Sequence, residues 1–143
     1  TDGTMRVYDE TETSAHELLA GGVWNTYSFG PALLVDGRLG DALGTYEVEA
    51  DARHGVQGTN PRTGIGWIES GHYVLVVVDG RNAGYSRGVT LEEFAQIFAG
   101  LGCTTAYNLD GGGSATMYFQ GEVVNEPSQK RGERAVSDIL LVG

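Results

Sequence analysis

The sequence is short of cysteine, of positive charge and of long apolar runs, and each shortage argues against a class of protein. Cys103 is the only cysteine, so no disulfide bond can form within the chain. Nine Lys and Arg residues face 19 Asp and Glu residues, which gives a net charge of −10. Nucleic acids and anionic membranes are bound by surfaces with an excess of positive charge, so we expect neither as a partner. The longest continuous apolar run, residues 73–78, is far too short to span a bilayer.

The usual motifs for metals and nucleotides are also lacking. His16, His54 and His72 are too dispersed for a zinc site, and no EF-hand loop is present. A divalent cation such as calcium, held by Asp and backbone oxygens, stays open as a cofactor. Neither GxGxxG spacing nor a Gly-Lys-Ser/Thr sequence is present, which argues against NAD or ATP. Cys103 has no metal-ligand spacing and no adjacent histidine, so we predict a buried structural thiol.

Short elements of both kinds predict one mixed domain. With 143 residues, of which 41% are hydrophobic, the chain is long enough for a single core. Apolar runs predict a hairpin whose strands, residues 63–69 and 72–78, are joined by Ser70-Gly71. We therefore predict an α+β fold, with a mixed, mainly antiparallel sheet and one or two packed helices. Further strands are expected at residues 32–35, 105–109, 115–119 and 138–142.

One helix carries strong signals at both of its ends. Thr90 can accept a hydrogen bond from the amide of Glu93 while the Glu93 side chain reaches back, which is a capping box. Gly100 and Gly102 end the pattern. One face of this helix is apolar at helical spacing, which predicts that it is buried in the core. The residues of this face are Leu91, Phe94, Ala95, Ile97, Phe98 and Leu101.

The most informative segment is YNLDGGGSATMY at residues 107–118, which joins a predicted strand to a carboxylate, three glycines and two hydroxyls. Asp110 follows the strand directly. The glycines at positions 111–113 have no Cβ, so a ligand can approach their backbone N–H groups. Such a loop predicts an anion-binding site that Asp110 faces. The alternative is a glycine-rich hairpin turn in which Asp110 is only a turn former.

Arginine is the other unusual feature, because Lys130 is the single lysine among the nine basic residues. The planar guanidinium binds phosphate or carboxylate through two parallel hydrogen bonds, so a few arginines suffice in an acidic protein. Arg62 and Arg134 are our candidates for such contacts, and Arg81 and Arg87 are interpreted as surface residues. Polar clusters at predicted strand ends and turns are residues 60–63, 79–81, 108–116 and 133–138.

The order and spacing of these clusters resembles the phosphodiester glycosidase family. The most specific feature is NLDGGGSAT at residues 108–116 combined with Arg-x-Val-Ser at residues 134–137. Family members carry a further amino-terminal portion ahead of the segment where this chain begins. We therefore expect residues 1–143 to be a single domain that is the carboxyl-terminal portion of a longer one, with the missing segment as a partner. The matching segments are SFGPAL at 28–33, PRTGIG at 61–66, DGR at 79–81, RGVTLEEFA at 87–95, NLDGGGSATM at 108–117 and ERAVSD at 133–138.

The resemblance implies a glycosidase that cleaves a sugar-1-phosphodiester, such as α-N-acetylglucosamine-1-phosphodiester, at the anomeric carbon. The products would be free sugar and a phosphomonoester. The resemblance also implies a sugar-phosphate or phosphodiester-linked glycan as partner, and an extracellular or cell-envelope location. Glycosidases pass through an oxocarbenium-like state and use two carboxylates for it. A phosphomonoester leaves readily as an anion, so stabilisation of charge matters more here than a strong general acid.

Each cluster then receives a role. Asp110 is the predicted nucleophile or general base, and Asp138 or Asp79 is the second carboxylate. The phosphate would be held by two arginines and the loop amides, and side chains would bind sugar hydroxyls or phosphate oxygens. The first set is Arg62, Arg134, Gly111, Gly112 and Gly113, and the second set is Asn108, Thr63, Ser114 and Thr116.

Alternatives stay open at two levels. The whole chain could be a non-catalytic module that binds glycans or anionic cell-wall polymers through the same glycine loop. It could also be half of a core that works as an assembly partner, which predicts exposed apolar strand edges. At the level of residues, Arg134 could instead pair with Asp138, and Asp79 could simply begin a turn.

Overall fold

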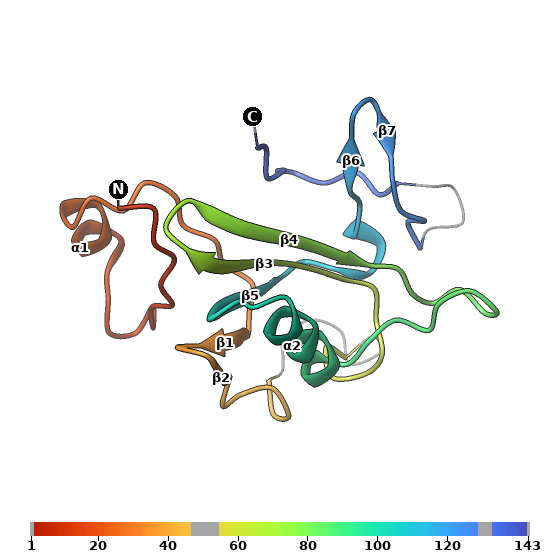
Figure 1. Cartoon of the computed structure of the whole chain (residues 1–143), viewed down its shortest axis with the longest axis horizontal. Helices are drawn as coiled ribbons and strands as arrows, with labels where there is room; N and C mark the ends of the chain where they lie inside the picture. Colours follow the sequence, from red (N-terminus) through yellow and green to blue (C-terminus); the bar gives the residue numbers. More distant parts are fainter. Residues whose placement is uncertain (1, 47–54, 129–132, 143) are drawn as a thin grey trace.

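A five-stranded sheet forms the centre of the fold (Figure 1). The computed structural model describes residues 2–46, 55–128 and 133–142. The strand order is β2-β1-β5-β3-β4, and each neighbouring pair is antiparallel. A separate two-stranded hairpin, β6-β7, follows the sheet in the chain. The bounds are α1 Ala15–Ala20, β1 Ala32–Val35, β2 Arg38–Leu39, β3 Arg62–Glu69, β4 His72–Val78, α2 Leu91–Gly100, β5 Thr105–Leu109, η2 Gly112–Ser114, β6 Tyr118–Phe119 and β7 Glu122–Val123.

The hairpin β3-β4 is the longest paired unit and confirms the strands predicted on either side of Ser70-Gly71. Its register runs from Arg62 opposite Val78 to Trp67 opposite Tyr73. Gly71 has a φ of +76°, a left-handed conformation that glycine adopts without the steric penalty of a Cβ. The α+β fold with a mainly antiparallel sheet is confirmed as well.

Helix α2 packs on the sheet where β3 carries glycine at alternate positions. A Cβ on Gly64 would lie 2.9 Å from the ring of Phe94, and one on Gly66 would lie 2.6 Å from the ring of Phe98. The two rings meet edge to face, with their centroids 5.1 Å apart. The predicted capping box is present, because Glu93 N donates to Thr90 Oγ1 and Thr90 N donates to the Glu93 carboxylate.

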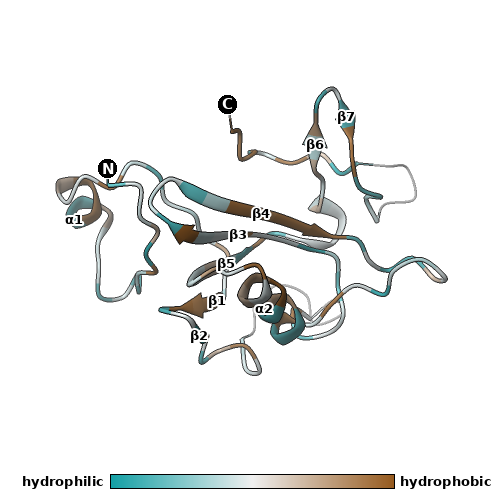
Figure 2. Cartoon of the chain, in the orientation of Figure 1, coloured by the Kyte–Doolittle hydropathy of each residue, from teal (hydrophilic) through white to brown (hydrophobic). Residues whose placement is uncertain are grey.

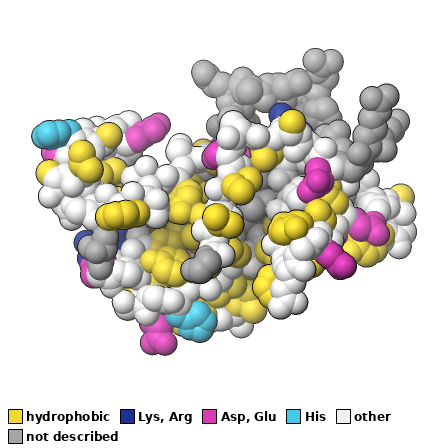
Figure 3. All heavy atoms as spheres, turned by 90° about the horizontal axis from the view of Figure 1, so that it is seen from above, with side chains coloured by type: hydrophobic (Ala, Val, Ile, Leu, Met, Phe, Trp, Pro, Cys, Tyr) yellow, Lys and Arg dark blue, Asp and Glu magenta, His cyan; other side chains and the backbone are white. Residues whose placement is uncertain are grey.

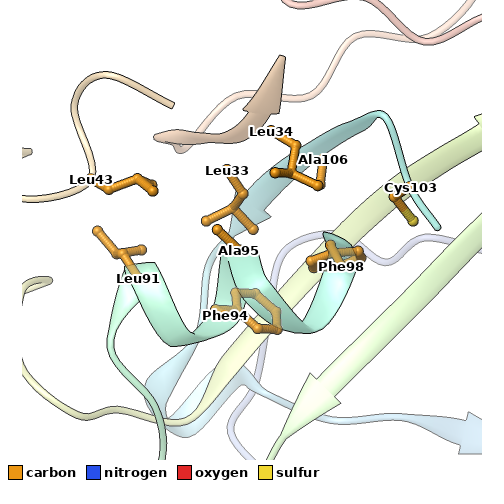
Figure 4. Close-up of a cluster of buried hydrophobic side chains, with 9 residues drawn as sticks. All are labelled: Leu33, Leu34, Leu43, Leu91, Phe94, Ala95, Phe98, Cys103 and Ala106. Carbon is orange, nitrogen blue, oxygen red and sulfur yellow. The ribbon is translucent and has the colours of Figure 1, made fainter. Parts of the chain in front are cut away.

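The core lies between α2 and one face of the sheet (Figure 4). Hydrophobic residues dominate β1 and β4 (Figure 2), and Leu33 and Leu34 of β1 are buried. Cys103 is 5% exposed and belongs to this cluster, so its predicted burial is confirmed. The buried cluster consists of Leu33, Leu34, Leu43, Leu91, Phe94, Ala95, Phe98, Cys103 and Ala106.

The opposite face of the sheet is less covered. Side chains alternate along a strand, so Tyr73 and Leu75 of the edge strand β4 point away from the face that carries Gly64 and Gly66. They are 44% and 38% exposed. A view from above shows hydrophobic side chains gathered in the middle of one face of the molecule (Figure 3). In the described residues, no helix is both long and apolar enough to cross a membrane.

Two predicted strands are corrected by the structure. Residues 138–142 form no strand, and Ile139, Leu141 and Val142 are 78%, 85% and 74% exposed. An apolar run becomes a strand only where a neighbour supplies ladder hydrogen bonds and buries one face, and the described residues supply neither here. The strand expected at 115–119 is reduced to Tyr118–Phe119, because the chain turns through η2 immediately before it.

Candidate functional site

Three of the four polar clusters, all but residues 133–138, meet at one end of the sheet. Antiparallel pairing sets Arg62 opposite Val78 and Thr63 opposite Leu109, so β3 begins where β4 and β5 end. The segments that follow β4 and β5 therefore lie beside the segment that precedes β3. We call this region the strand-end junction, and it comprises residues 60–63, 79–81, 88–89 and 108–114.

Glycine allows three segments of the strand-end junction to touch the backbone of Asn60 and Pro61. A Cβ on Gly80 would lie 2.8 Å from Pro61 N, and one on Gly88 would lie 2.4 Å from Asn60 O. A Cβ on Gly111 would lie 2.6 Å from Pro61 O. These separations are too short for any side chain. The glycines in the DGR, RGV and DGGG segments are therefore explained first by close backbone approach, which sequence reasoning did not anticipate.

Three amides in and just after the glycine loop already donate to backbone carbonyls, one of them to Pro61 O and two within the loop itself. The amides of Gly112, Ser114 and Ala115 donate to backbone carbonyls at 2.9, 3.0 and 3.3 Å. Those of Gly111 and Gly113 donate to no backbone carbonyl in the described ranges. The predicted anion-binding role of Gly111, Gly112 and Gly113 thus narrows to the N–H groups of Gly111 and Gly113, and Gly113 is buried.

Asp79 and Asp110 follow β4 and β5, the two strands that flank β3, but they differ in their contacts. The Asp79 carboxylate accepts hydrogen bonds from Tyr85 Oη at 3.1 Å, Asn125 Nδ2 at 2.8 Å and Glu126 N at 3.0 Å. The hydrogen bond from Tyr85 to this carboxylate raises the pKa of the Tyr85 phenol. Asp110 is exposed, and its carboxylate accepts no hydrogen bond from any described residue. Asp110 is therefore the carboxylate of the strand-end junction that can meet a ligand.

The side chain of Arg62 is buried, and its guanidinium donates hydrogen bonds to backbone carbonyls. It is 3% exposed; Nε donates to Val89 O at 3.1 Å, and Nη2 donates to Val56 O at 2.6 Å and Gly58 O at 2.8 Å. Burial, and secondarily the nearby charge of Arg81, lowers the pKa of the Arg62 guanidinium to about 10. Arg62 therefore ties the loop before β3 to the segment before α2.

Arg81 lies closer to the glycine loop than its interpretation as a surface residue implies. Its Nη2 donates to Asn60 Oδ1 at 2.7 Å. A Cβ on Gly112 would lie 3.3 Å from Arg81 Nη1, so the guanidinium lies directly against the loop. The side chain is nevertheless exposed. The signal that could have found it is the pairing of β3 with both β4 and β5, which brings the segments after β4 and β5 together.

Asn108 fastens the strand-end junction to the loop that enters β1. It is 1% exposed, and its Nδ2 donates to Gly30 O at 2.7 Å. The backbones of Asn108 and Gly30 are joined by a further hydrogen bond of 3.1 Å. Three buried side-chain oxygens, Asn108 Oδ1, Thr63 Oγ1 and Ser114 Oγ, have no hydrogen-bond partner within the described structure. Buried polar atoms are nearly always paired, so these oxygens are open to a donor from a ligand or water.

The remaining candidates are not brought to the strand-end junction. Arg134 and Asp138 lie in the exposed segment 133–142, where Asp138 accepts a hydrogen bond from Ser137 Oγ at 2.7 Å. No ion pair joins Arg134 to Asp138 in the part of the chain that the structure describes. Thr116 is half-buried and follows η2. The residues described contain no group of three or more His, Cys, Asp or Glu side chains that could hold a metal ion.

Comparison with known proteins identifies a matching family and several similar proteins. A family model described as phosphodiester glycosidase matches residues 1–143. The SPbeta prophage-derived protein YomE of Bacillus subtilis is 36% identical over 99% of this chain and 21% of its own length. The N-acetylglucosamine-1-phosphodiester alpha-N-acetylglucosaminidase of Bos taurus is 32% identical over 93% of this chain and 26% of its own length. This chain thus spans about a fifth to a quarter of these curated relatives.

Solved structures share both the fold and part of the sequence. Among them is the zebrafish N-acetylglucosamine-1-phosphodiester alpha-N-acetylglucosaminidase catalytic domain, auto-inhibited by its pro-peptide. The match has a TM-score of 0.54 and 30% sequence identity, and it covers 68% of this chain and 33% of that chain. The strand-end junction therefore lies in a chain whose fold is found within a longer catalytic domain.

Proposed function

Because the chain belongs to the phosphodiester glycosidase family, we propose that it cleaves a sugar-1-phosphodiester at the anomeric carbon. The products are free sugar and a phosphomonoester. The bovine and zebrafish relatives, whose names specify N-acetylglucosamine-1-phosphodiester, support this substrate class. A phosphodiester-linked glycan is then the partner, and we place the reaction outside the cell or in its envelope.

The observation that carries the proposal is the exposed carboxylate of Asp110, which follows β5 and has no hydrogen-bond partner among the described residues. It is followed at once by the glycine loop, where the amides of Gly111 and of the buried Gly113 donate to no described backbone carbonyl. A carboxylate beside the anomeric carbon can act as nucleophile or as general base through an oxocarbenium-like state. Asp110 takes this role in our proposal, and the loop amides stabilise the negative charge that develops on the departing phosphate.

The other residues of the strand-end junction divide into ligand contacts and supports. Asn108, Thr63 and Ser114 each have a buried oxygen available, and we assign them, with Thr116, to sugar hydroxyls or phosphate oxygens. Arg62 acts mainly through the backbone it holds. Asp79 is a positioning residue in our proposal, because its carboxylate holds neighbouring segments in place through three hydrogen bonds.

Asp138 remains the proposed second carboxylate and Arg134 a proposed phosphate contact. Their place in the sequence pattern supports both roles. Binding without turnover is the second candidate function, and one observation favours it: no described contact brings a second carboxylate to Asp110. Glycoside hydrolysis requires two carboxyl groups roughly 5–10 Å apart.

The test is release of free N-acetylglucosamine from an N-acetylglucosamine-1-phosphodiester by the protein and by Asp110→Asn. Asp41→Asn is the matched control, because Asp41 is an exposed aspartate in the loop after β2. We expect turnover in the wild type and in Asp41→Asn, and a loss of at least about 100-fold in Asp110→Asn, the scale of one lost catalytic group. Full activity in a folded Asp110→Asn protein would refute the role of Asp110. Saturable binding of the substrate without turnover would favour the binding module.

A further inference from the structure

We propose that Arg81 binds the anionic phosphoryl group of the substrate and sets it beside Asp110. This inference rests on the proposed function and assigns one group of the substrate to one side chain. The sequence pattern alone pointed to Arg62 and Arg134 for this contact. Three features of the strand-end junction support Arg81.

The first feature is positive charge without a carboxylate partner. Described ion pairs join Arg6 to Asp2 at 3.4 Å and Arg87 to Glu93. In the same ranges neither Arg62 nor Arg81 pairs with a carboxylate, and Arg62 feels the charge of Arg81. Two neighbouring guanidinium groups repel each other, and an anion placed against them relieves that repulsion. In a chain of net charge −10, such a cluster is a local exception.

The second feature is that the Arg81 guanidinium is anchored on one side only. Nη2 donates to Asn60 Oδ1 at 2.7 Å, while Nδ2 of Asn60 donates to Gly55 O at 3.2 Å and to Gly58 O at 3.1 Å. Asn60 is therefore a fixed acceptor. A guanidinium has five N–H donors in a planar fork, so a pair of donors remains for bidentate contact with phosphate oxygens.

The third feature is the contact between Arg81 and the glycine loop. Gly112 has a φ of +59°, and a Cβ there would lie 3.3 Å from Nη1 of Arg81. Gly112 is two residues from Asp110, so an anion on Arg81 lies next to that carboxylate. No described ion pair joins Arg81 to Asp110. A substrate with a phosphoryl group bonded to an electrophilic carbon matches this arrangement, since the phosphoryl group meets Arg81 and the carbon meets Asp110.

The segment 81–87 lines an open hollow of ≈ 480 Å³ that includes neither Asp110 nor the glycine loop, so this segment supplies a control for the proposal. Arg81 lies at one end of this segment and Arg87 at the other. Arg87 is ion-paired with Glu93, which holds its pKa above the usual value and leaves its charge compensated. The two arginines share one loop and similar exposure, so Arg87 is a matched control for Arg81.

The experiment is a titration with inorganic phosphate, followed by chemical shifts of backbone amides in the wild type, Arg81→Gln, Arg81→Lys and Arg87→Gln. A charge-assisted bidentate contact predicts roughly 10- to 100-fold weaker phosphate binding in Arg81→Gln. Arg81→Lys keeps the charge and loses the planar fork, so its affinity for phosphate should lie between those of the wild type and Arg81→Gln. Arg87→Gln should bind phosphate with the affinity of the wild type. In the wild type, the backbone amides of Gly111 and Gly113 should show the largest changes in chemical shift.

Several outcomes would overturn the proposal. They are a wild type that does not bind phosphate, equal affinity in a folded Arg81→Gln protein, and equal losses in Arg81→Gln and Arg87→Gln. The assay needs no turnover, so it separates this proposal from the proposed function. Phosphate binding that depends on Arg81 in a protein without hydrolytic activity would sustain the phosphoryl site while refuting the glycosidase.

Discussion

Replacing Gly88 by alanine should destabilise the protein far more than the same change at Gly84. Both glycines belong to the segment between β4 and α2, and both have a φ of +85°. They differ in surroundings: a Cβ on Gly88 would lie 2.4 Å from Asn60 O, whereas a Cβ on Gly84 would meet nothing within 4 Å. The pair therefore separates the conformational cost of alanine from the cost of the steric overlap.

The magnitudes follow from these two contributions. A left-handed alanine costs roughly 1–2 kcal/mol, and the stiffer unfolded chain offsets roughly 0.4–1 kcal/mol of it, so Gly84→Ala should lose about 1 kcal/mol. Overpacking adds roughly 1–3 kcal/mol. The obstacle at Gly88 is a backbone oxygen that cannot rotate away, so Gly88→Ala should lose about 2–4 kcal/mol, the sum of the conformational cost and the overpacking.

A third variant tests the overlap without a left-handed backbone. Gly111 has a negative φ of −128°, so alanine carries no left-handed penalty there, but its Cβ would lie 2.6 Å from Pro61 O. Gly111→Ala should therefore lose about 2 kcal/mol through overpacking. The assay is urea unfolding of the three variants and the wild type, followed by circular dichroism. If Gly88→Ala is no less stable than Gly84→Ala, the strand-end junction is not held by close backbone approach, and our explanation of its glycines is wrong.

Two further predictions concern groups whose pKa values are shifted. Burial raises the pKa of the Cys103 thiol, so Cys103 should react with an aromatic disulfide reagent only after urea unfolds the protein; rapid stoichiometric reaction of the native protein would contradict its burial. The hydrogen bond from Arg87, followed by that from the Thr90 amide, lowers the pKa of Glu93. Ionised Glu93 therefore contributes stability that is present above its unfolded pKa and is lost as the pH falls through the lower folded value. The difference in melting temperature between wild type and Glu93→Gln should shrink from about pH 6 to about pH 3, and a constant difference would contradict this role.

Features with a local cause could be predicted from the sequence. The hairpin depends on Ser70-Gly71 between two apolar runs, and α2 depends on Thr90 and Glu93, which are three residues apart. Each of these signals lies within the element that it specifies. The structure confirms them because the same residues make the hydrogen bonds in the folded protein.

Features that depend on distant neighbours could not be predicted in the same way. Arg81 was interpreted as a surface residue because nothing in the DGR segment indicates that β5 lies one strand away from β4. The sequence narrowed the candidate carboxylates to Asp79, Asp110 and Asp138, but only the contacts of Asp79 distinguish it from Asp110. The strand expected at 138–142 was wrong because apolar composition does not indicate whether a pairing partner exists.

The three hydrogen bonds of Asp79 also have a mechanical consequence. One carboxylate joins Tyr85, in the loop that follows Arg81, to Asn125 and Glu126, which follow the hairpin β6-β7. Asn125 in turn holds the amide of Met117 at 2.8 Å, just before β6. Segments that share hydrogen bonds open as one cooperative unit. The loop beside the arginine and the small hairpin should therefore exchange their amide protons together, so that an insertion in one is felt by the other.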